Sequence, residues 1–399
     1  MLTTTVNLYK NAYSGLTRRT WLLSIVMLIN RSGTMVLPFM TLYCNDRGYT
    51  QTQGGLAVAI YGVGSLFGAF IGGRLSDKLG FYYVQFAALF FGGIMFIILG
   101  QMNSYLTICI CIFFTSMVNE SFRPANSSAI AYYSTSQNRT QSFSLNRLAI
   151  NLGWGVGSAL AGMLASVSYK LLFWVDGFTN IAAAIVLLLI LPKVTLAEQH
   201  KNDQVKSKTN KTPYQDKTFL MFVGFMLLFA LCFFQLFTTV PLYFKEGLHL
   251  NEFWIGVVMS MNGIVIALFE MVVVFRLEGS RPYLKLMQYG TLLLALSYFM
   301  LNIPLANGFM LATIVILMVT VAEIVGMPFM NSYYIARTTP ENRGQYAALY
   351  TMAWSSAQVI GSLSGTQIAH SFGFYYLWWI LGGLCVLTAF GFNYLQTKR

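Results

Sequence analysis

Long apolar segments separated by short polar ones run along most of the 399-residue chain. Repeated apolar runs of about 20 residues predict membrane-spanning helices, because a helix satisfies its backbone polar groups internally, as lipid requires. The pattern predicts twelve helices, at about 20–43, 53–73, 81–101, 104–134, 142–166, 171–191, 218–244, 253–275, 284–303, 308–336, 345–370 and 375–394. We therefore expect an all-α polytopic membrane protein with both termini on the same side.

Composition agrees with this class. Apolar residues make up 56% of the chain and charged residues 10%, against roughly 25% charged in soluble domains. The first twenty residues are polar and carry no cleavable signal pattern. Five cysteines lie in or beside apolar runs without the spacing of a metal or redox site, so we interpret them as packing residues: Cys44, Cys109, Cys111, Cys232 and Cys385.

The distribution of basic residues predicts the orientation. With the N terminus in the cytoplasm, nineteen of the 25 Lys and Arg residues fall in the inside segments, and only Arg47, Lys170 and Lys245 fall outside. Cytoplasmic segments of membrane proteins carry such an excess. We therefore expect cytoplasmic termini and a bacterial-type inner membrane, and the net charge of +12 needs no nucleic-acid partner.

A hydrophilic segment at 192–217 separates two sets of six helices. It predicts a flexible linker between an N-terminal bundle, 1–191, and a C-terminal bundle, 218–399. A regulatory or partner-binding loop is the alternative interpretation of this segment.

The two halves share an internal repeat at a shift of 204 residues. Asn138-Arg139 corresponds to Asn342-Arg343, and Pro124 corresponds to Pro328. Parallel six-helix repeats around a central pathway are typical of rocker-type secondary transporters, whose substrate site lies near the membrane midplane.

The segment from Gly73 to Gly80 fits the signature G-x-x-x-D-[RK]-x-G and is expected to form the loop between helices 2 and 3. Two basic residues follow in the full signature, but Phe81 and Tyr82 stand at those positions here. The matching positions are Gly73, Asp77, Lys78 and Gly80.

Twelve helices in two sets of six, a basic linker and this signature together resemble the major facilitator superfamily over essentially the whole chain. The resemblance implies that Asp77 caps helix 11 near Gln345 and latches the two halves in the outward-open state. A carboxylate beside an exposed helix N-terminus is favoured by about 0.3–1 kcal/mol. The alternative is that these charges only mark the membrane surface.

Six ionisable side chains are expected deep inside membrane helices, where each costs about 2.5–3.5 kcal/mol and usually faces a cavity or a partner. We interpret Arg147 and Glu270 as gate or structural charges, and Asp176, near the outer surface, is not counted. The six are Arg31, Glu120, Arg123, Arg147, Glu270 and Glu323.

The resemblance implies that helices 1, 4, 7 and 10 line the substrate cavity. Arg31, Glu120 and Glu323 would then converge there, and the two carboxylates are the main candidates for carrying a coupling proton. A permanent Glu120–Arg123 ion pair at i, i+3 is the alternative. Asn30 and Gln235 are candidate cavity residues. The alternative is that their side chains form hydrogen bonds that join helices.

Helix 5 carries a run of small residues similar to G-x-x-x-G-P-x-x-G-G, the signature of superfamily antiporters. Gly153, Gly157 and Gly162 match, while Ser158 replaces the proline and Ala161 replaces a glycine. Small residues allow two helices to approach closely. We therefore expect a helix-packing motif, with weaker support for antiport.

A second, partial resemblance is to the proton-coupled oligopeptide transporters. Asn30-Arg31 lies where that family has Glu-Arg, and the run from Arg123 to Asn126 is similar to its Lys-Pro-Asn. The family's helix 1 glutamates are replaced by Met27 and Asn30.

These features predict a proton-coupled secondary transporter that exports amphipathic small molecules by antiport. Uptake of peptides or another nutrient by symport is the alternative, and a receptor on the same scaffold predicts binding without counterflow. We expect a monomer that uses the proton gradient and no cofactor or metal. No enzyme or ATPase motif is present, and the histidines are far apart in sequence: His200, His249 and His370.

Overall fold

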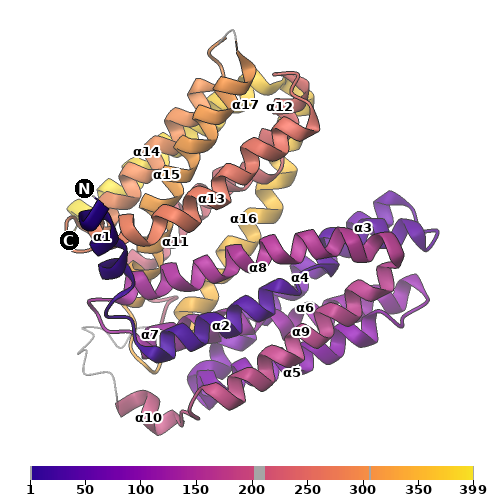
Figure 1. Cartoon of the computed structure of the whole chain (residues 1–399), viewed down its shortest axis with the longest axis vertical. Helices are drawn as coiled ribbons and strands as arrows, with labels where there is room; N and C mark the ends of the chain where they lie inside the picture. The colour runs from indigo at the N-terminus through magenta and orange to yellow at the C-terminus, as the bar shows by residue number, and fades with distance from the viewer. Residues whose placement is uncertain (1, 202–211, 305–306, 399) are drawn as a thin grey trace. The chain divides into compact units, whose positions relative to one another are not determined.

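The computed structural model describes residues 2–201, 212–304 and 307–398. Every regular element in this part of the chain is a helix (Figure 1). Ten helical stretches among these residues are long and apolar enough to cross a membrane. The ninth and eleventh predicted helices correspond to α14 (Tyr283–Met300) and α16 (Arg343–Phe372). The prediction of an all-α polytopic protein is confirmed.

The chain divides into two compact units, which are described separately. We call residues 16–213 and 335–355 the N-terminal unit, and residues 1–15, 214–334 and 356–399 the C-terminal unit. Each unit therefore contains a short segment from the opposite end of the chain.

The N-terminal unit contains the first six predicted membrane helices. In this unit α4 packs against α6, α5 against α9, and α2 against α8 (Figure 1). Its helices are α2 Arg18–Ser32, α3 Val36–Asp46, α4 Gln51–Leu79, α5 Phe81–Leu99, α6 Tyr105–Glu120, α7 Phe122–Tyr133, α8 Arg139–Val167, α9 Tyr169–Ile190, α10 Leu196–Lys201 and the start of α16. The short helix α10 lies in the predicted linker, whose residues 202–211 fall outside the described residues.

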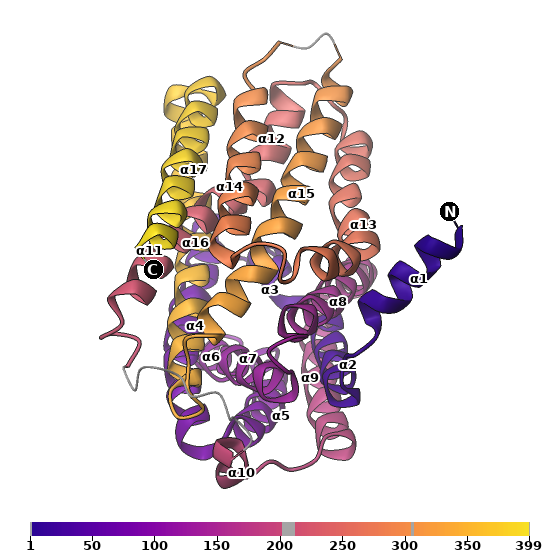
Figure 2. The ribbon, with the colours of Figure 1, turned by 90° about the vertical axis from the view of Figure 1, so that its left-hand side faces the viewer.

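The C-terminal unit contains the remaining helices, and α14 lies beside α17 in it (Figure 2). The elements are α1 Leu2–Tyr13, α11 Lys217–Phe233, the 3₁₀ helix η1 Phe234–Phe237, α12 Thr239–Glu246, α13 Glu252–Leu277, α14, α15 Gly308–Ile335, the rest of α16 and α17 Phe374–Thr397. Aromatic side chains fill its core: Tyr298 stacks on Trp378, with ring centroids 5.8 Å apart.

Three helices that were predicted as continuous are interrupted. Helix 1 breaks between Ser32 and Val36, helix 4 breaks at Ser121, and helix 7 contains η1. The average hydropathy of each of these three segments stays high across its break, so it did not reveal the interruption. Broken membrane helices are found where irregular backbone is buried in protein or lines a cavity.

The signature from Gly73 to Gly80 was predicted to form a loop, and this prediction was wrong. Helix α4 continues to Leu79, so the signature forms its last two turns. The chain reverses at Gly80, whose φ of 91° favours glycine, and α5 begins at the next residue.

Helix α1 is an element that the sequence pattern did not predict. It packs on α13, where the Tyr9 hydroxyl donates a hydrogen bond to the Leu268 carbonyl at 2.9 Å and Ala12 is fully buried. Burial raises the pKa of Tyr13, with smaller contributions from Tyr9 and from the Glu270 carboxylate. The N-terminal segment is therefore anchored to the C-terminal unit.

The internal repeat is visible in local structure. The Asn138 side chain accepts a hydrogen bond from the Thr135 N–H at 2.8 Å, and Asn342 does the same for Thr339 at 2.8 Å. Each turn leads directly into a helix, α8 or α16. The repeat-related residues thus build the same turn twice.

Candidate functional site

The N-terminal unit contains a buried polar cluster where helix 4 is interrupted. Glu120 is the last residue of α6, and α7 begins at Phe122. Helix α4 passes very close to the break, because a Cβ atom on Gly72 would lie only 2.5 Å from the Ser121 Cα. The interruption therefore presents Glu120 and Arg123 from two different helical segments.

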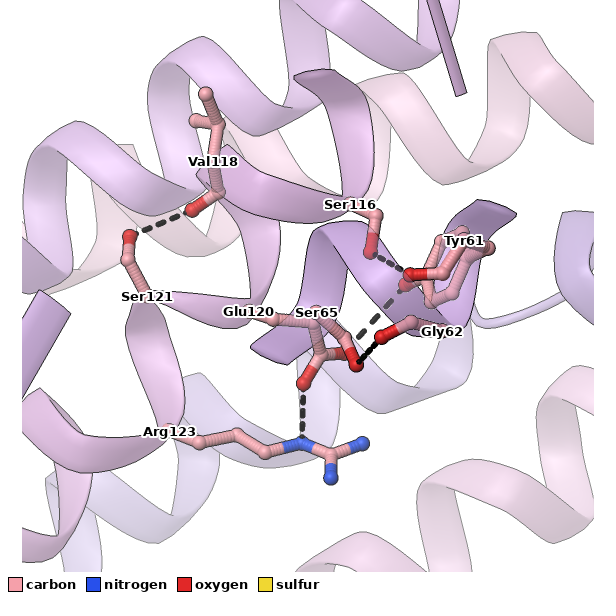
Figure 3. A network of polar contacts seen from close by, with 8 residues as sticks. All are labelled: Tyr61, Gly62, Ser65, Ser116, Val118, Glu120, Ser121 and Arg123. Carbon is pink, nitrogen blue, oxygen red and sulfur yellow. Dashed lines mark hydrogen bonds and ion pairs between the residues drawn. The ribbon is translucent and has the colours of Figure 1, made fainter. Parts of the chain in front are cut away.

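Glu120 is bound by one group from α7 and one from α4 (Figure 3). Its Oε2 forms an ion pair with the Arg123 Nε at 2.7 Å, and its Oε1 accepts a hydrogen bond from the Tyr61 hydroxyl at 3.4 Å. Ser116 donates to the Tyr61 carbonyl at 2.5 Å and holds α4 against α6. The i, i+3 ion pair that the sequence offered as an alternative is present.

Arg31 lies in the last turn of α2, close enough to Glu120, Arg123 and Tyr61 to interact electrostatically with each. It is 9% exposed. In the part of the chain that the structure describes, its Nε has no hydrogen-bond partner. The predicted approach of Arg31 to Glu120 is therefore found, although the two form no direct ion pair.

The break in helix 1 is held by α9. The Asp176 carboxylate accepts hydrogen bonds from the Met35 and Val36 N–H groups at 3.0 Å each, at the start of α3. Asn180 accepts a hydrogen bond from the Asn30 side chain at 2.8 Å. Asp176 is 2% exposed, so it is a buried charged residue with a structural role, although it was not counted among the candidate residues.

Sequence reasoning missed Asp176 although a signal was present. A carboxylate inside an apolar run costs several kcal/mol unless it has partners, and Ser32-Gly33-Thr34 is a polar interruption of helix 1. The free N–H groups of a half-helix are a natural partner for a carboxylate. Asp176 and Asn180 thus fix the segment that carries Arg31.

Replacing Asp176 with Asn is expected to destabilise the protein by about 1–3 kcal/mol, because one of the two buried N–H groups loses its acceptor oxygen. Thermal unfolding in detergent can be followed with a thiol-reactive dye, since all five cysteines are buried. Asp46→Asn at the exposed end of α3 is the matched control. Equal melting temperatures for Asp176→Asn and the wild type would contradict this role.

A second buried carboxylate lies in the C-terminal unit. Glu323 on α15 is 7% exposed, and its Oε2 accepts a hydrogen bond from the Asn262 amide of α13 at 3.0 Å. The same amide also donates to the Thr320 hydroxyl at 3.0 Å. This carboxylate and Glu120 belong to different units, so their predicted convergence stays a prediction.

Asp77 makes the contact that the resemblance implied. Its Oδ1 accepts a hydrogen bond from the Gly344 N–H at 2.6 Å, and its Oδ2 accepts one from the Gln345 N–H at 2.9 Å, in the first turn of α16. Gly73 and Gly344 allow this crossing, because a Cβ atom on either would collide with the carbonyl oxygen of the other. Lys78 is exposed. The role of the Asp77 contact as a latch between the two halves stays a prediction.

The family model for the Major Facilitator Superfamily matches residues 20–357. The chain belongs to this superfamily. It is therefore a small-molecule transporter embedded in a membrane, and not an enzyme. Among the described residues, no group of three His, Cys, Asp or Glu side chains is placed to hold a metal ion.

Curated relatives are similar over most of their length. A Na(+), Li(+), K(+)/H(+) antiporter from Planococcus maritimus is 26% identical over 404 aligned positions, covering 92% of each chain. The quinolone resistance protein NorA from Staphylococcus aureus is 23% identical, covering 82% of this chain and 84% of NorA.

Solved structures of the superfamily share the fold. The human organic anion transporter MFSD10 (TETRAN) has a TM-score of 0.74 at 12% identity, covering 94% of this chain and 99% of its own. A bacterial homologue of the iron transporter ferroportin, in an outward-facing state, has a TM-score of 0.72 at 16% identity. The match covers 96% of this chain and 100% of the homologue.

The superfamily-like glycine run of helix 5 packs on helix 1 at two of its three positions. A Cβ atom on Gly153 would lie 2.6 Å from the Arg31 Cβ, and one on Gly157 would lie 3.0 Å from the Ser32 carbonyl oxygen. A Cβ atom on Gly162 would meet no described atom within 4 Å, so the predicted packing role fails there. The run therefore supports the backbone of Arg31.

Two residues that were predicted to line the cavity form hydrogen bonds between helices. Asn30 is bonded to Asn180, as described above. Gln235 in η1 donates to the Gly361 carbonyl of α16 at 2.8 Å and accepts a hydrogen bond from Thr239 at 2.8 Å. Both side chains are buried and already engaged, which favours the alternative interpretation of helix-joining hydrogen bonds.

Proposed function

We propose that the chain is a proton-coupled secondary transporter that exports amphipathic small molecules in exchange for protons, by alternating access. The observation that carries this proposal is the buried Glu323 carboxylate, bonded to a neutral amide in a membrane helix. Such a carboxylate can take up a proton on one side of the membrane and release it on the other.

Glu323 fits the role of proton carrier better than Glu120, which the sequence had ranked with it. Protonating Glu120 would break its ion pair with the Arg123 guanidinium, in which the two atoms lie 2.7 Å apart. The Asn262 amide can hydrogen-bond the Glu323 carboxyl group both with and without a proton, because an amide is a donor and an acceptor. We therefore assign the exchanged proton to Glu323.

The relatives support exchange. One is named as an antiporter of alkali cations and protons, and the other as a quinolone resistance protein. Exchange of a small molecule for protons accounts for both names. We further propose a monomer in a bacterial-type inner membrane, with both termini in the cytoplasm, powered by the proton gradient without a cofactor.

Uptake by symport of a peptide or another small nutrient is the second candidate function. The observation that favours it is the excess of positive charge at Arg31 and Arg123, which suits a substrate with a carboxylate. In this case substrate and proton would enter together.

Reconstituted vesicles with equal pH on both sides and a clamped membrane potential distinguish these functions. A fluoroquinolone, a cationic dye, Na⁺ or a dipeptide is added outside while an internal dye reports pH. Exchange is expected to raise the internal pH, whereas symport would lower it. An internal pH that matches protein-free vesicles for every compound would contradict proton coupling.

A further inference from the structure

Arg123 uses only one of its three nitrogens on Glu120. The Nε faces the carboxylate, and the two terminal nitrogens point away from it (Figure 3). The Arg123 side chain is 38% exposed, whereas that of Glu120 is 4% exposed. Within the described residues, neither terminal nitrogen of Arg123 has a hydrogen-bond partner. The end of the guanidinium is therefore open to a ligand.

Arg31 supplies a second positive charge to the same cluster. It is nine-tenths buried and its Nε lacks a hydrogen-bond partner in the described part of the chain. A buried donor that stays unsatisfied costs about 1–3 kcal/mol, and more when it is charged. Gly153 and the Asn30–Asn180 bond hold the surrounding backbone, so Arg31 is kept in place at this cost.

The charges of the cluster do not balance. Arg31 and Arg123 contribute two positive charges, Glu120 contributes one negative charge, and Tyr61 and Ser116 are neutral. An excess positive charge in a membrane interior is expensive unless a counter-charge neutralises it. One anionic group would make the cluster neutral with Glu120 still ionised.

We propose that the open end of Arg123, together with Arg31, binds a carboxylate group of the transported compound. A planar guanidinium fork matches a carboxylate through two parallel hydrogen bonds, which a lysine cannot provide. This inference rests on the proposed function and assigns its substrate class: an amphipathic molecule with a carboxylate, either as an anion or as a zwitterion. The substrate then binds at the N-terminal cluster, and the exchanged proton at Glu323.

The test measures binding to purified protein in detergent, without a membrane gradient. The probes are two matched pairs, 1-naphthoate with 1-naphthamide and a fluoroquinolone with its methyl ester. The wild type is expected to bind each acid at least about tenfold more tightly than the partner that lacks the carboxylate, because charge-assisted bonds to arginine are strong. Acids that bind no better than the partners without a carboxylate, or no binding at all, would overturn the inference.

Four variants locate the effect, and a fifth is the control. Arg31→Gln and Arg123→Gln should each lose the preference for acids, and Glu120→Gln should bind acids more tightly because a competing carboxylate is gone. Arg123→Lys keeps the positive charge but removes the planar guanidinium group, and should lose most of the preference for acids. Because this variant is a conservative one, such a loss would indicate lost recognition and not misfolding. Arg19→Gln removes a charge elsewhere on α2 and should behave as the wild type.

A preference for acids that survives both Arg31→Gln and Arg123→Gln would also reject the site. Failure of the proposed function would look different: acid binding would be normal while the vesicles showed no proton-linked transport.

Discussion

Vesicles that contain the Glu323→Gln variant are expected to lose nearly all transport driven by an imposed pH gradient. Glutamine cannot take up a proton, but it keeps the size of glutamate and can still accept a hydrogen bond from Asn262. Exchange of labelled for unlabelled substrate should therefore persist, because this exchange moves no net protons. The two measurements on one preparation separate loss of coupling from loss of folding.

Glu246→Gln is the matched control, since it removes an exposed carboxylate from the same unit and should leave both activities intact. Glu120→Gln provides the contrast. If the N-terminal cluster binds substrate while Glu323 carries the proton, then Glu120→Gln keeps a response to the pH gradient and changes substrate affinity. Gradient-driven transport that is normal in Glu323→Gln would reject the proposed role.

The architecture was readable from the sequence because its signals are averages over many residues. Twenty apolar residues are enough to indicate a membrane helix, and the repeat of Asn138 at Asn342 was visible without coordinates. The contact of Asp77 with the first turn of α16 followed from a signature whose meaning was supplied by resemblance. Each of these inferences depends on spacing along the chain.

The interruptions of the helices could not be read in the same way. A break at Gly33 or Ser121 is stable only because another helix satisfies or covers the freed backbone, as Asp176 does for α3. That partner is 140 residues away in the chain, and hydropathy carries no information about it. The same limit applies to α1, whose anchor is the carbonyl group of Leu268.

The candidate site was predicted as a set of residues but not as an arrangement. Sequence reasoning named Arg31, Glu120 and Arg123, yet it could not say which nitrogen of Arg123 meets Glu120. That detail decides whether the guanidinium is fully used or still open. Side-chain geometry at a helix break depends on tertiary packing, so only the structure shows it.

The second large effect is expected for Asp77→Asn, which should shift the protein towards the inward-open state. Asp77 accepts two backbone hydrogen bonds, one on each carboxylate oxygen, from Gly344 and Gln345. Asparagine keeps one side-chain oxygen, but its NH2 group would face the other backbone N–H. Two donors cannot form a hydrogen bond, so one of the two bonds would be lost. A loss of about 1–3 kcal/mol in this contact corresponds to a change of roughly 5–150-fold in the ratio of the two states.

Spin labels at K193C and K398C, both exposed positions, measure this shift as a distance distribution. The five native cysteines are buried, which favours selective labelling. Asp77→Asn should increase the population of long distances, whereas the exposed control Asp46→Asn should not. Identical distributions in Asp77→Asn and the wild type would mean that the Asp77 contact joins two helices without biasing the transport cycle, and the signature would then mark the membrane surface only.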